Sequence, residues 1–255
     1  YYWPIYVELT NEEMSKYDEL TKKIAAKLGA KKYLTTSDDD DRNDPSNKRA
    51  DLIANAENKM KILENLCDEK QWKLNQTLIY CTSNQHPLHP TKDTQLEKVN
   101  ELLSDHHVTI KSVTYRDPTK SRINILDNLA TGHYNCLTAV KCLDEGMDIP
   151  SIETAIMMAS SGNPKQYVQR RGRVLRPSPK TRKKWAVIYD ILVKPPLDSS
   201  KDTRERKLVA KELLRHKEFA STAKNEQKAI DIIKDIAEEY DIDLKKLSYD
   251  YIQNL

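Results

Sequence analysis

The chain has 255 residues, which is enough for one large domain or two small ones with a buried core. Apolar residues make up 38% and charged residues 32%, and the formal net charge is only +3, so a cationic coat over the whole protein is excluded. No apolar run approaches the ~20 residues that cross a bilayer, and no signal peptide is evident, so we expect a cytoplasmic protein with no membrane partner.

The first predicted region, residues 1–70, is a helical lead-in that contains an acidic loop. Thr10 and Glu13 have the spacing of a capping box, and the apolar residues that follow recur at helical spacing. The segment "SDDDDRNDPSN", residues 37–47, predicts a solvated loop, and it lacks the glycine and the spacing of a calcium site. A second helix is expected over residues 48–70.

The second predicted region, residues 71–198, alternates between strands and helices. Helices are expected near residues 96–104, over residues 119–132 and within residues 164–184. The expected strands are the apolar runs "TLIYCTS", "VTIKSVTY", "NCLTAV", "ETAIMMA" and "WAVIYDILV". Strands that alternate with helices of ten or more residues predict an α/β fold with a parallel, doubly wound sheet.

The third predicted region, residues 199–255, is a helical C-terminal extension without a strand. Its apolar residues recur at helical spacing in two stripes, which we interpret as packing faces.

Cysteine and histidine positions argue against a metal site. The four cysteines lie in apolar runs, and we expect reduced thiols in the core: Cys67, Cys81, Cys136 and Cys142. No paired Cys or His spacing closes a tetrahedral zinc site, so no metal is expected. Four histidines in loops or at element ends are expected to be solvated: His86, His89, His106 and His107.

The segment "PKQYVQRRGRVLRPSPKTRKK", residues 164–184, carries nine basic residues and no acidic one. "DEGMDIP" (144–150) follows one expected strand, and "SGNPKQ" (161–166) follows the next. Open α/β sheets bind ligands beyond the carboxyl ends of their strands. We therefore expect both polar clusters to project from the same edge of the sheet, where the basic segment begins.

Three of these segments resemble the motifs of superfamily 2 helicases. "QRRGRVLR", residues 169–176, is similar to the Q-x-x-G-R-x-x-R signature of motif VI, and residues 144–150 are similar to motif V. "TLIYCTS" occupies the place of motif IV. Their order resembles the second RecA-like lobe of these motors, over about residues 59–196, in the branch of the XPB-type repair helicases and restriction-enzyme translocases. The resemblance implies a RecA-like parallel sheet flanked by N-terminal and C-terminal helical segments.

The resemblance also implies how the chain meets ATP. Phosphoryl transfer spreads negative charge over the γ-phosphate, and guanidinium groups meet such charge bidentately. Arg173 and Arg176 share one helix face with Gln169 and correspond to the arginine fingers, whereas Gln169 helps to sense the γ-phosphate. A solvated basic helix is the alternative. Further nucleotide-binding positions in these motifs are Gly146, Asp148, which contacts the ribose, and Gly172, which permits close backbone packing.

Nucleic-acid contacts are expected from residues that follow the strands. Val140 stands where many helicases have a threonine that touches backbone phosphate, so that contact is left to Lys141 as a candidate. Thr82 and Ser83 are candidates at motif IV, with a strand-end capping role as the alternative for each. The full candidate set for nucleic acid is Thr82, Ser83, Arg116, Arg122 and Lys141.

The sequence contains no G-x-x-x-x-G-K-[ST], the loop that cradles ATP phosphates beside Mg²⁺. Asp144 and Glu145 are not taken as a metal-binding acidic pair, because Lys141 interrupts the strand before them. We therefore expect ATP and Mg²⁺ to be held mainly by a first RecA-like lobe ahead of Tyr1. The predicted function is the second motor lobe of an ATP-dependent DNA helicase or translocase, inactive alone, acting on double-stranded or partly unwound DNA. The alternative is a non-catalytic module that binds nucleic acid or protein.

Overall fold

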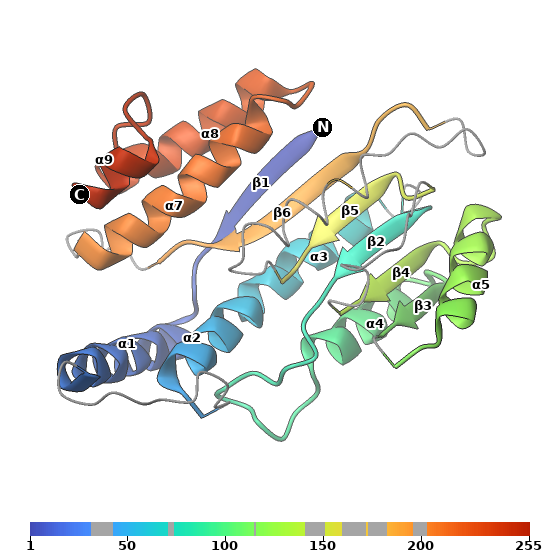
Figure 1. The fold of residues 1–255 in the computed structure, drawn as a ribbon. Helices are drawn as coiled ribbons and strands as arrows, with labels where there is room; N and C mark the ends of the chain where they lie inside the picture. The colour runs from blue at the N-terminus through green and yellow to red at the C-terminus, as the bar shows by residue number, and fades with distance from the viewer. Residues whose placement is uncertain are drawn as a thin grey trace.

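Six strands form one parallel sheet, with helices on both of its faces (Figure 1). The computed structural model describes residues 1–31, 43–70, 74–114, 116–140, 151–159, 172, 183–195 and 203–255. The strands are β1 (Tyr2–Val7), β2 (Thr77–Tyr80), β3 (Ile110–Val113), β4 (Cys136–Ala139), β5 (Thr154–Met157) and β6 (Val187–Val193). The helices are α1 (Asn11–Lys31), α2 (Pro45–Ala54), α3 (Glu57–Lys70), α4 (Gln95–Asp105), α5 (Thr119–Ala130), α7 (Thr203–Ala220), α8 (Glu226–Glu239) and α9 (Tyr249–Gln253).

The strand order is β1-β6-β5-β2-β4-β3, and every neighbouring pair is parallel. The predicted α/β fold with a parallel sheet is therefore confirmed, and each of the five predicted strands forms. The structure adds β1, which the sequence analysis did not identify. This strand pairs with β6 over its whole length, from Tyr2 opposite Ile188 to Val7 opposite Val193.

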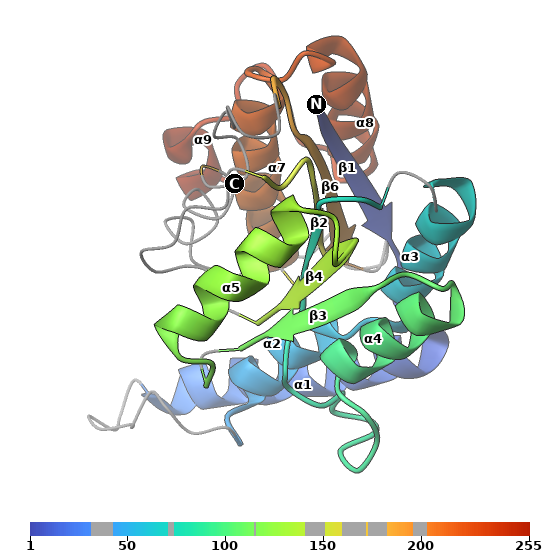
Figure 2. The same cartoon turned by 90° about the vertical axis from the view of Figure 1, so that its right-hand side faces the viewer.

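Apolar side chains on the two sheet faces form two separate cores. Helices α3 and α4 cover one face, where their leucines and valines meet side chains from β2, β4, β5 and β6. Helices α5, α7 and α8 cover the other face, where the larger core lies. Figure 2 shows α3 and α4 on the opposite side of the sheet from α5 and α7. The sheet is therefore covered on both faces, as is typical of a doubly wound fold.

Helices α1 and α2 pack on each other beside the sheet around a small apolar cluster that includes Tyr17, Leu20 and Leu52. The predicted capping box is present, because Glu13 N donates to Thr10 Oγ1 and Thr10 N donates to the Glu13 carboxylate. The single helix expected over residues 48–70 is wrong. The structure has two helices there, separated at Asn55, which ends α2.

The C-terminal helices pack against β1, at one edge of the sheet. Asn225, in the turn between α7 and α8, donates from Nδ2 to the Tyr2 carbonyl at 2.8 Å and accepts from Tyr2 N–H at 2.9 Å. The side-chain amide thus pairs with the outer side of this edge strand. Of the helices in the described part of the chain, none combines the length and apolar character that a bilayer crossing needs.

Candidate nucleic-acid interface

The carboxyl ends of β2, β4 and β5 lie side by side. Tyr80 is in register with Ala139 of β4 and with Met157 of β5. Just beyond them, Cys81 N–H donates to the Ala139 carbonyl at 2.8 Å, and Met158 N–H donates to the Tyr80 carbonyl at 3.0 Å. The residues that lead into the three motif-like segments therefore leave the sheet at one edge, as expected.

Most positions that the helicase resemblance relates to nucleotide lie outside the described residues. These are Gln169, Arg173, Arg176, Gly146 and Asp148, together with the nucleic-acid candidate Lys141. Gly172 is described as helical and exposed, and no described residue lies within 4 Å of the place that a Cβ would take there. Close packing at Gly172 and the roles of the other six positions stay predictions.

Thr82 and Ser83 follow β2 at the carboxyl edge. Thr82 is half-buried, and its Oγ1 accepts a hydrogen bond from Asn84 N–H at 3.1 Å. This contact closes a turn of the type that Ser and Thr side chains form with backbone two residues on. Ser83 is exposed. The Thr82 oxygen thus caps the turn after β2, which fits the alternative role. The hydroxyl hydrogen of Thr82 and the Ser83 hydroxyl stay candidates for binding a nucleic-acid phosphate.

Arg116 lies in the loop between β3 and α5, and Arg122 lies in the first turn of α5, next to the same edge. Val113, the last residue of β3, is in register with Ala139, so this loop starts level with the motif ends. Arg122 is half-buried, and its Nε donates to the carbonyl of Asp117 at 2.7 Å. Arg116 is exposed. The Arg122 side chain thus ties the start of α5 to the preceding loop, and Arg116 is the more accessible cation of the two.

Thr138, near the missing motif V threonine, is fully buried and cannot reach a phosphate in this structure. Its Oγ1 lies 2.8 Å from Asn100 Oδ1 and 2.9 Å from Ser112 Oγ, and Asn100 Nδ2 donates to Ser112 at 2.9 Å. The three side chains form a closed hydrogen-bonded ring between α4 and the sheet. Val140 is also buried. Both residues therefore have packing roles.

The Glu13 junction, formed by Thr10, Glu13, Glu57 and His86, was not foreseen as a unit. Glu13 is 0% exposed, and its carboxylate accepts from the N–H groups of Thr10 and Glu57 and from His86 Nε2, each at 2.9 Å. Burial alone would raise the pKa of Glu13, but the hydrogen bonds from these three donors outweigh it and lower the pKa below its ordinary value. The carboxylate is therefore ionised at neutral pH.

The expectation that His86 is solvated is wrong, because its side chain is 2% exposed. Leu88 N–H donates to His86 Nδ1 at 3.1 Å, so the proton of the neutral ring is assigned to Nε2, which donates to Glu13. The partner lies 73 positions away in the sequence, and no local signal marks it. His89 stacks on this ring with centroids 5.5 Å apart.

Lys59, on α3, is a buried lysine at the same edge. It is 2% exposed, and its Nζ donates to the Met158 carbonyl, just beyond β5, at 2.8 Å. Burial lowers the pKa of Lys59 to about 8, although the charges of Asp190 and Glu13 oppose that shift. Lys59 thus holds the start of the segment that leads to the basic stretch.

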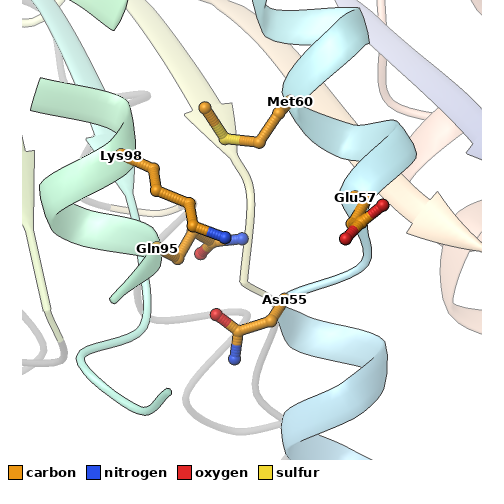
Figure 3. A pocket seen from close by; sticks show the side chains of 5 residues that line it. All are labelled: Asn55, Glu57, Met60, Gln95 and Lys98. Carbon is orange, nitrogen blue, oxygen red and sulfur yellow. The ribbon is translucent and has the colours of Figure 1, made fainter. Parts of the chain in front are cut away.

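A cavity of about 210 Å³ lies next to the Glu13 junction, between α3 and α4 (Figure 3). Gln95 belongs to its wall and also holds the nearby loop, since its Oε1 accepts from Thr82 N–H at 3.0 Å and its Nε2 donates to the Ala54 carbonyl at 2.7 Å. The lining residues are Asn55, Glu57, Met60, Gln95 and Lys98. The cavity therefore adjoins the loop that carries Thr82 and Ser83.

A second buried polar group, the β6–α7 cluster, consists of Tyr2, Tyr6, Asp190, Glu212, Arg215 and His216. His216 is 0% exposed, with Nδ1 at 2.7 Å from Tyr6 Oη and Nε2 at 3.3 Å from Arg215 Nη2. Since a guanidinium only donates, Nε2 accepts and Nδ1 carries the proton. Burial first, and the Arg215 charge second, lower the pKa of His216 well below its ordinary value.

Three of the four cysteines are described, and Cys67, Cys81 and Cys136 are free and buried, as expected. Burial raises the pKa of Cys67 to about 11, so its thiol stays protonated at neutral pH. Across the described ranges, no three His, Cys, Asp or Glu side chains are grouped so that they could hold a metal ion.

The sequence matches one protein family and several known proteins. Residues 58–178 match the helicase conserved C-terminal domain family. The chain is 28% identical over 218 residues to DNA 3'-5' translocase XPB2 of Sulfurisphaera tokodaii, covering 79% of this chain and 45% of the relative. It is 33% identical over 89 residues to Dicer-like protein 2 of Neurospora crassa, covering 34% of this chain and 6% of the relative. The chain thus spans less than half of these relatives.

Solved structures with a similar arrangement include other helicase-related fragments. The C-terminal domain of the DEAD-box protein Dbp5 aligns with a TM-score of 0.43 at 16% identity, over 55% of this chain and 73% of that one. The C-terminal part of the Fun30 ATPase domain aligns with a TM-score of 0.41 at 14% identity, over 72% of this chain and 51% of that one.

Proposed function

Residues 58–178 form a helicase conserved C-terminal domain, the second RecA-like lobe of superfamily 2 helicases and translocases, and from this premise we propose that the chain is the second motor lobe of an ATP-dependent DNA helicase or translocase. One relative is named as a DNA 3'-5' translocase, which supports DNA as the track. The activity would belong to a longer protein in which a first lobe completes the ATP site.

The observation that carries this proposal is the common edge at which β2, β4 and β5 end in register. Three motif-like segments start from these strands in the order that superfamily 2 motors use. This edge carries the Thr82 and Ser83 hydroxyls, which we assign to nucleic-acid phosphate, and it also carries residues 158–159, after which the chain continues toward the basic segment. A motor needs such proximity, because ATP hydrolysis must change how the lobe holds its track.

In the proposed mechanism, Arg173 and Arg176 enter the ATP site between two lobes and stabilise charge that develops on the γ-phosphate. Gln169, Gly146, Asp148 and Gly172 complete the contribution of this lobe. The first lobe supplies the phosphate loop, a pattern that the sequence of this chain lacks, and the Mg²⁺ ligands. The nucleic-acid contacts are assigned to Thr82, Ser83, Arg116, Arg122 and Lys141.

Arg176→Ala in the two-lobe protein tests the catalytic half of the proposal. We expect the kcat for ATP to fall by roughly 10³–10⁵-fold while ATP affinity stays within several-fold, because an arginine finger acts on the transition state. Arg171→Ala, in the same basic segment, is the matched control, because a residue two positions from Gln169 and Arg173 would not share their face of a helix. An unchanged kcat with weaker DNA binding would contradict the assignment. The isolated chain should hydrolyse no ATP above background, with or without DNA.

The rival function is a non-catalytic module that binds nucleic acid or protein. Both functions allow the isolated chain to bind DNA, but they differ in how. A motor lobe should bind unrelated oligonucleotides equally, with a Kd no tighter than roughly 10⁻⁴–10⁻⁶ M and steep salt dependence. Tight, salt-insensitive binding to one sequence would favour the rival.

A further inference from the structure

The loop between β2 and α4, which carries Thr82 and Ser83, is tied to the helical lead-in at successive points. Gln95 connects Thr82 N–H to the last carbonyl of α2, and Asn84 Nδ2 donates to Asp51 Oδ1 of α2 at 2.6 Å. His86 then donates to Glu13 of α1 at 2.9 Å. The Gln95 contacts are partly buried, and the contact between Asn84 and Asp51 is exposed. The third contact is buried on both sides and involves an ionised carboxylate.

Glu13 connects more than the loop. Its carboxylate also accepts the backbone N–H of Glu57, at the start of α3, and that of Thr10, ahead of α1. Three segments that are far apart in the sequence thus share one buried acceptor. A charged acceptor makes roughly twice as strong a hydrogen bond as a neutral one, and a buried donor without a partner is costly. The position of His86 is therefore strongly specified by the fold.

The turn that His86 anchors also orients a hydroxyl. Thr82 Oγ1 accepts from Asn84 N–H, so this oxygen uses a lone pair inside the loop and directs its own hydrogen away from that donor. Ser83 is exposed beside it, at the edge where β2, β4 and β5 end. Two neighbouring hydroxyls held in this way suit a phosphate oxygen, which only accepts.

We propose that Glu13 and His86 are positioning residues for nucleic-acid binding, which hold the Thr82–Ser83 turn in the one conformation that meets a backbone phosphate. This inference rests on the proposed function, since it assumes that nucleic acid passes this edge. Neither residue touches the nucleic acid. They lower the entropic cost of binding nucleic acid, because a loop that is already ordered loses less conformational entropy when the phosphate binds.

The experiment compares two buried histidines. Fluorescence anisotropy would measure the binding of the chain to unrelated single-stranded and double-stranded oligonucleotides at several salt concentrations. His86→Leu should weaken binding about five- to tenfold, because the turn must now be ordered on binding. The slope of log affinity against log salt should not change, since hydroxyl contacts release no counterions. His216→Leu removes a buried hydrogen bond in the β6–α7 cluster and should leave affinity within about twofold.

A double-mutant cycle separates positioning from general damage. In a Thr82→Val, Ser83→Ala background the hydroxyls are gone, so adding His86→Leu should change affinity by less than about twofold. His86→Gln keeps a neutral N–H donor and should restore affinity to within about twofold of the wild type. Circular dichroism at each salt concentration would show that the folded fraction is the same in all variants. Should His86→Leu not fold, His86→Gln compared with His86→Ser makes the same test.

The outcomes distinguish the inference from the proposed function. Equal losses for His86→Leu and His216→Leu, or full additivity with the hydroxyl substitutions, would overturn the positioning role and leave the motor lobe standing. If the wild-type chain binds no oligonucleotide at any salt concentration, the nucleic-acid half of the proposed function fails and this inference fails with it.

Discussion

His86 and His216 are both buried histidines with side-chain partners, yet their surroundings have opposite chemistry. His86 donates to an ionised carboxylate that also receives two backbone N–H groups. His216 accepts from a guanidinium and lies in a cluster that contains two carboxylates, Asp190 and Glu212. Burial and the nearby positive charge keep its ring neutral. The Glu13 junction therefore depends on a charge, and the β6–α7 cluster depends on a neutral ring among charges.

The two regions also connect different parts of the fold. The Glu13 junction joins α1, α3 and the loop after β2, so it acts on the carboxyl edge of the sheet. The β6–α7 cluster joins α7 to β1 and β6, through Tyr6 and Asp190, on the face that carries the larger core. One buried polar group therefore supports a candidate site, whereas the other attaches a helical extension to the sheet.

The substitution that removes the shared acceptor of the Glu13 junction should have the largest effect on stability. Glu13→Leu would leave three donors in a buried place without their acceptor, and each such group costs about 1–3 kcal/mol. We expect the free energy of unfolding to fall by about 3 kcal/mol or more. Urea unfolding at pH 7 would measure it, with the exposed neighbour Glu12→Leu as the control. A loss as small as that of the control would mean that other groups satisfy these donors.

Lys59 is linked to both regions, because the charges of Asp190 in the β6–α7 cluster and of Glu13 act on its ammonium group. Its folded pKa of about 8 lies below the ordinary 10.5, so the folded state releases the proton first as pH rises. Stability should therefore increase between pH 8 and 10.5, and the difference between wild type and Lys59→Met should change by roughly 2 kcal/mol from pH 7.5 to 10. The exposed Lys61→Met is the control. A pH-independent difference would contradict the buried, charged state of Lys59.

Acid should affect the β6–α7 cluster before the Glu13 junction. The unfolded chain protonates His216 below about pH 6.5 while the folded ring stays neutral, so its contribution is lost as pH falls from there. The stability difference between wild type and His216→Gln should shrink by about 1 kcal/mol from pH 6.5 to 5.5. The facing groups, which are Tyr6, Asp190, Glu212 and Arg215, are present in both proteins and cancel.

Glu13→Gln provides the contrast in the same titration. The folded pKa of Glu13 lies below its ordinary value of 4.5, so its contribution is present above pH 4.5 and is lost only as pH falls further. The difference between wild type and Glu13→Gln should therefore stay constant from pH 6.5 to 5.5. If both differences moved together, the two regions would not be chemically distinct.

Another small effect is expected at the ring of Thr138, Asn100 and Ser112. Thr138→Val keeps the side-chain shape but removes the hydroxyl, and it should lower the free energy of unfolding by about 1 kcal/mol. DNA affinity, measured by anisotropy, should not change, because Thr138 is buried. Ser83→Ala is the matched comparison, with little effect on stability and weaker DNA binding. Reduced affinity in Thr138→Val alone would give Thr138 the phosphate contact that its burial argues against.

The parallel sheet was predictable because its inner strands are short apolar runs between helices, and this local pattern does not depend on distant partners. β1 was not predictable, because no local pattern in its sequence indicates the strand with which it pairs. Its Pro4 argues against an inner strand, and β6, with which it pairs, lies more than 180 residues away. Proline is tolerated at the edge of a sheet, where its missing N–H is not needed.

The candidate site was predictable to a smaller extent. Motif order placed Thr82 and Ser83 beyond a strand, and the structure agrees. The capping box revealed Thr10 and Glu13 as neighbours, but the same carboxylate also binds Glu57 and His86, and such tertiary partners leave no periodic trace in a sequence. The break between α2 and α3 was missed for the same reason, since the first N–H of α3 is held by Glu13. The assignments at Arg173 and Arg176 stay predictions.

The pairing of β1 with β6 determines which part of the chain can be moved into another protein as a folded unit. The family match, residues 58–178, ends before β6 and starts after β1, so a graft cut to the match would lose two of six strands. β5 would then become an edge strand with unpaired backbone N–H and C=O groups. Because β5 also carries the apolar side chains of Ala155, Ile156 and Met157, it would tend to pair with strands of other chains. A transferable fragment must keep the whole sheet. It must therefore include β1 at its N-terminal end and β6, with the helices that follow it, at its C-terminal end.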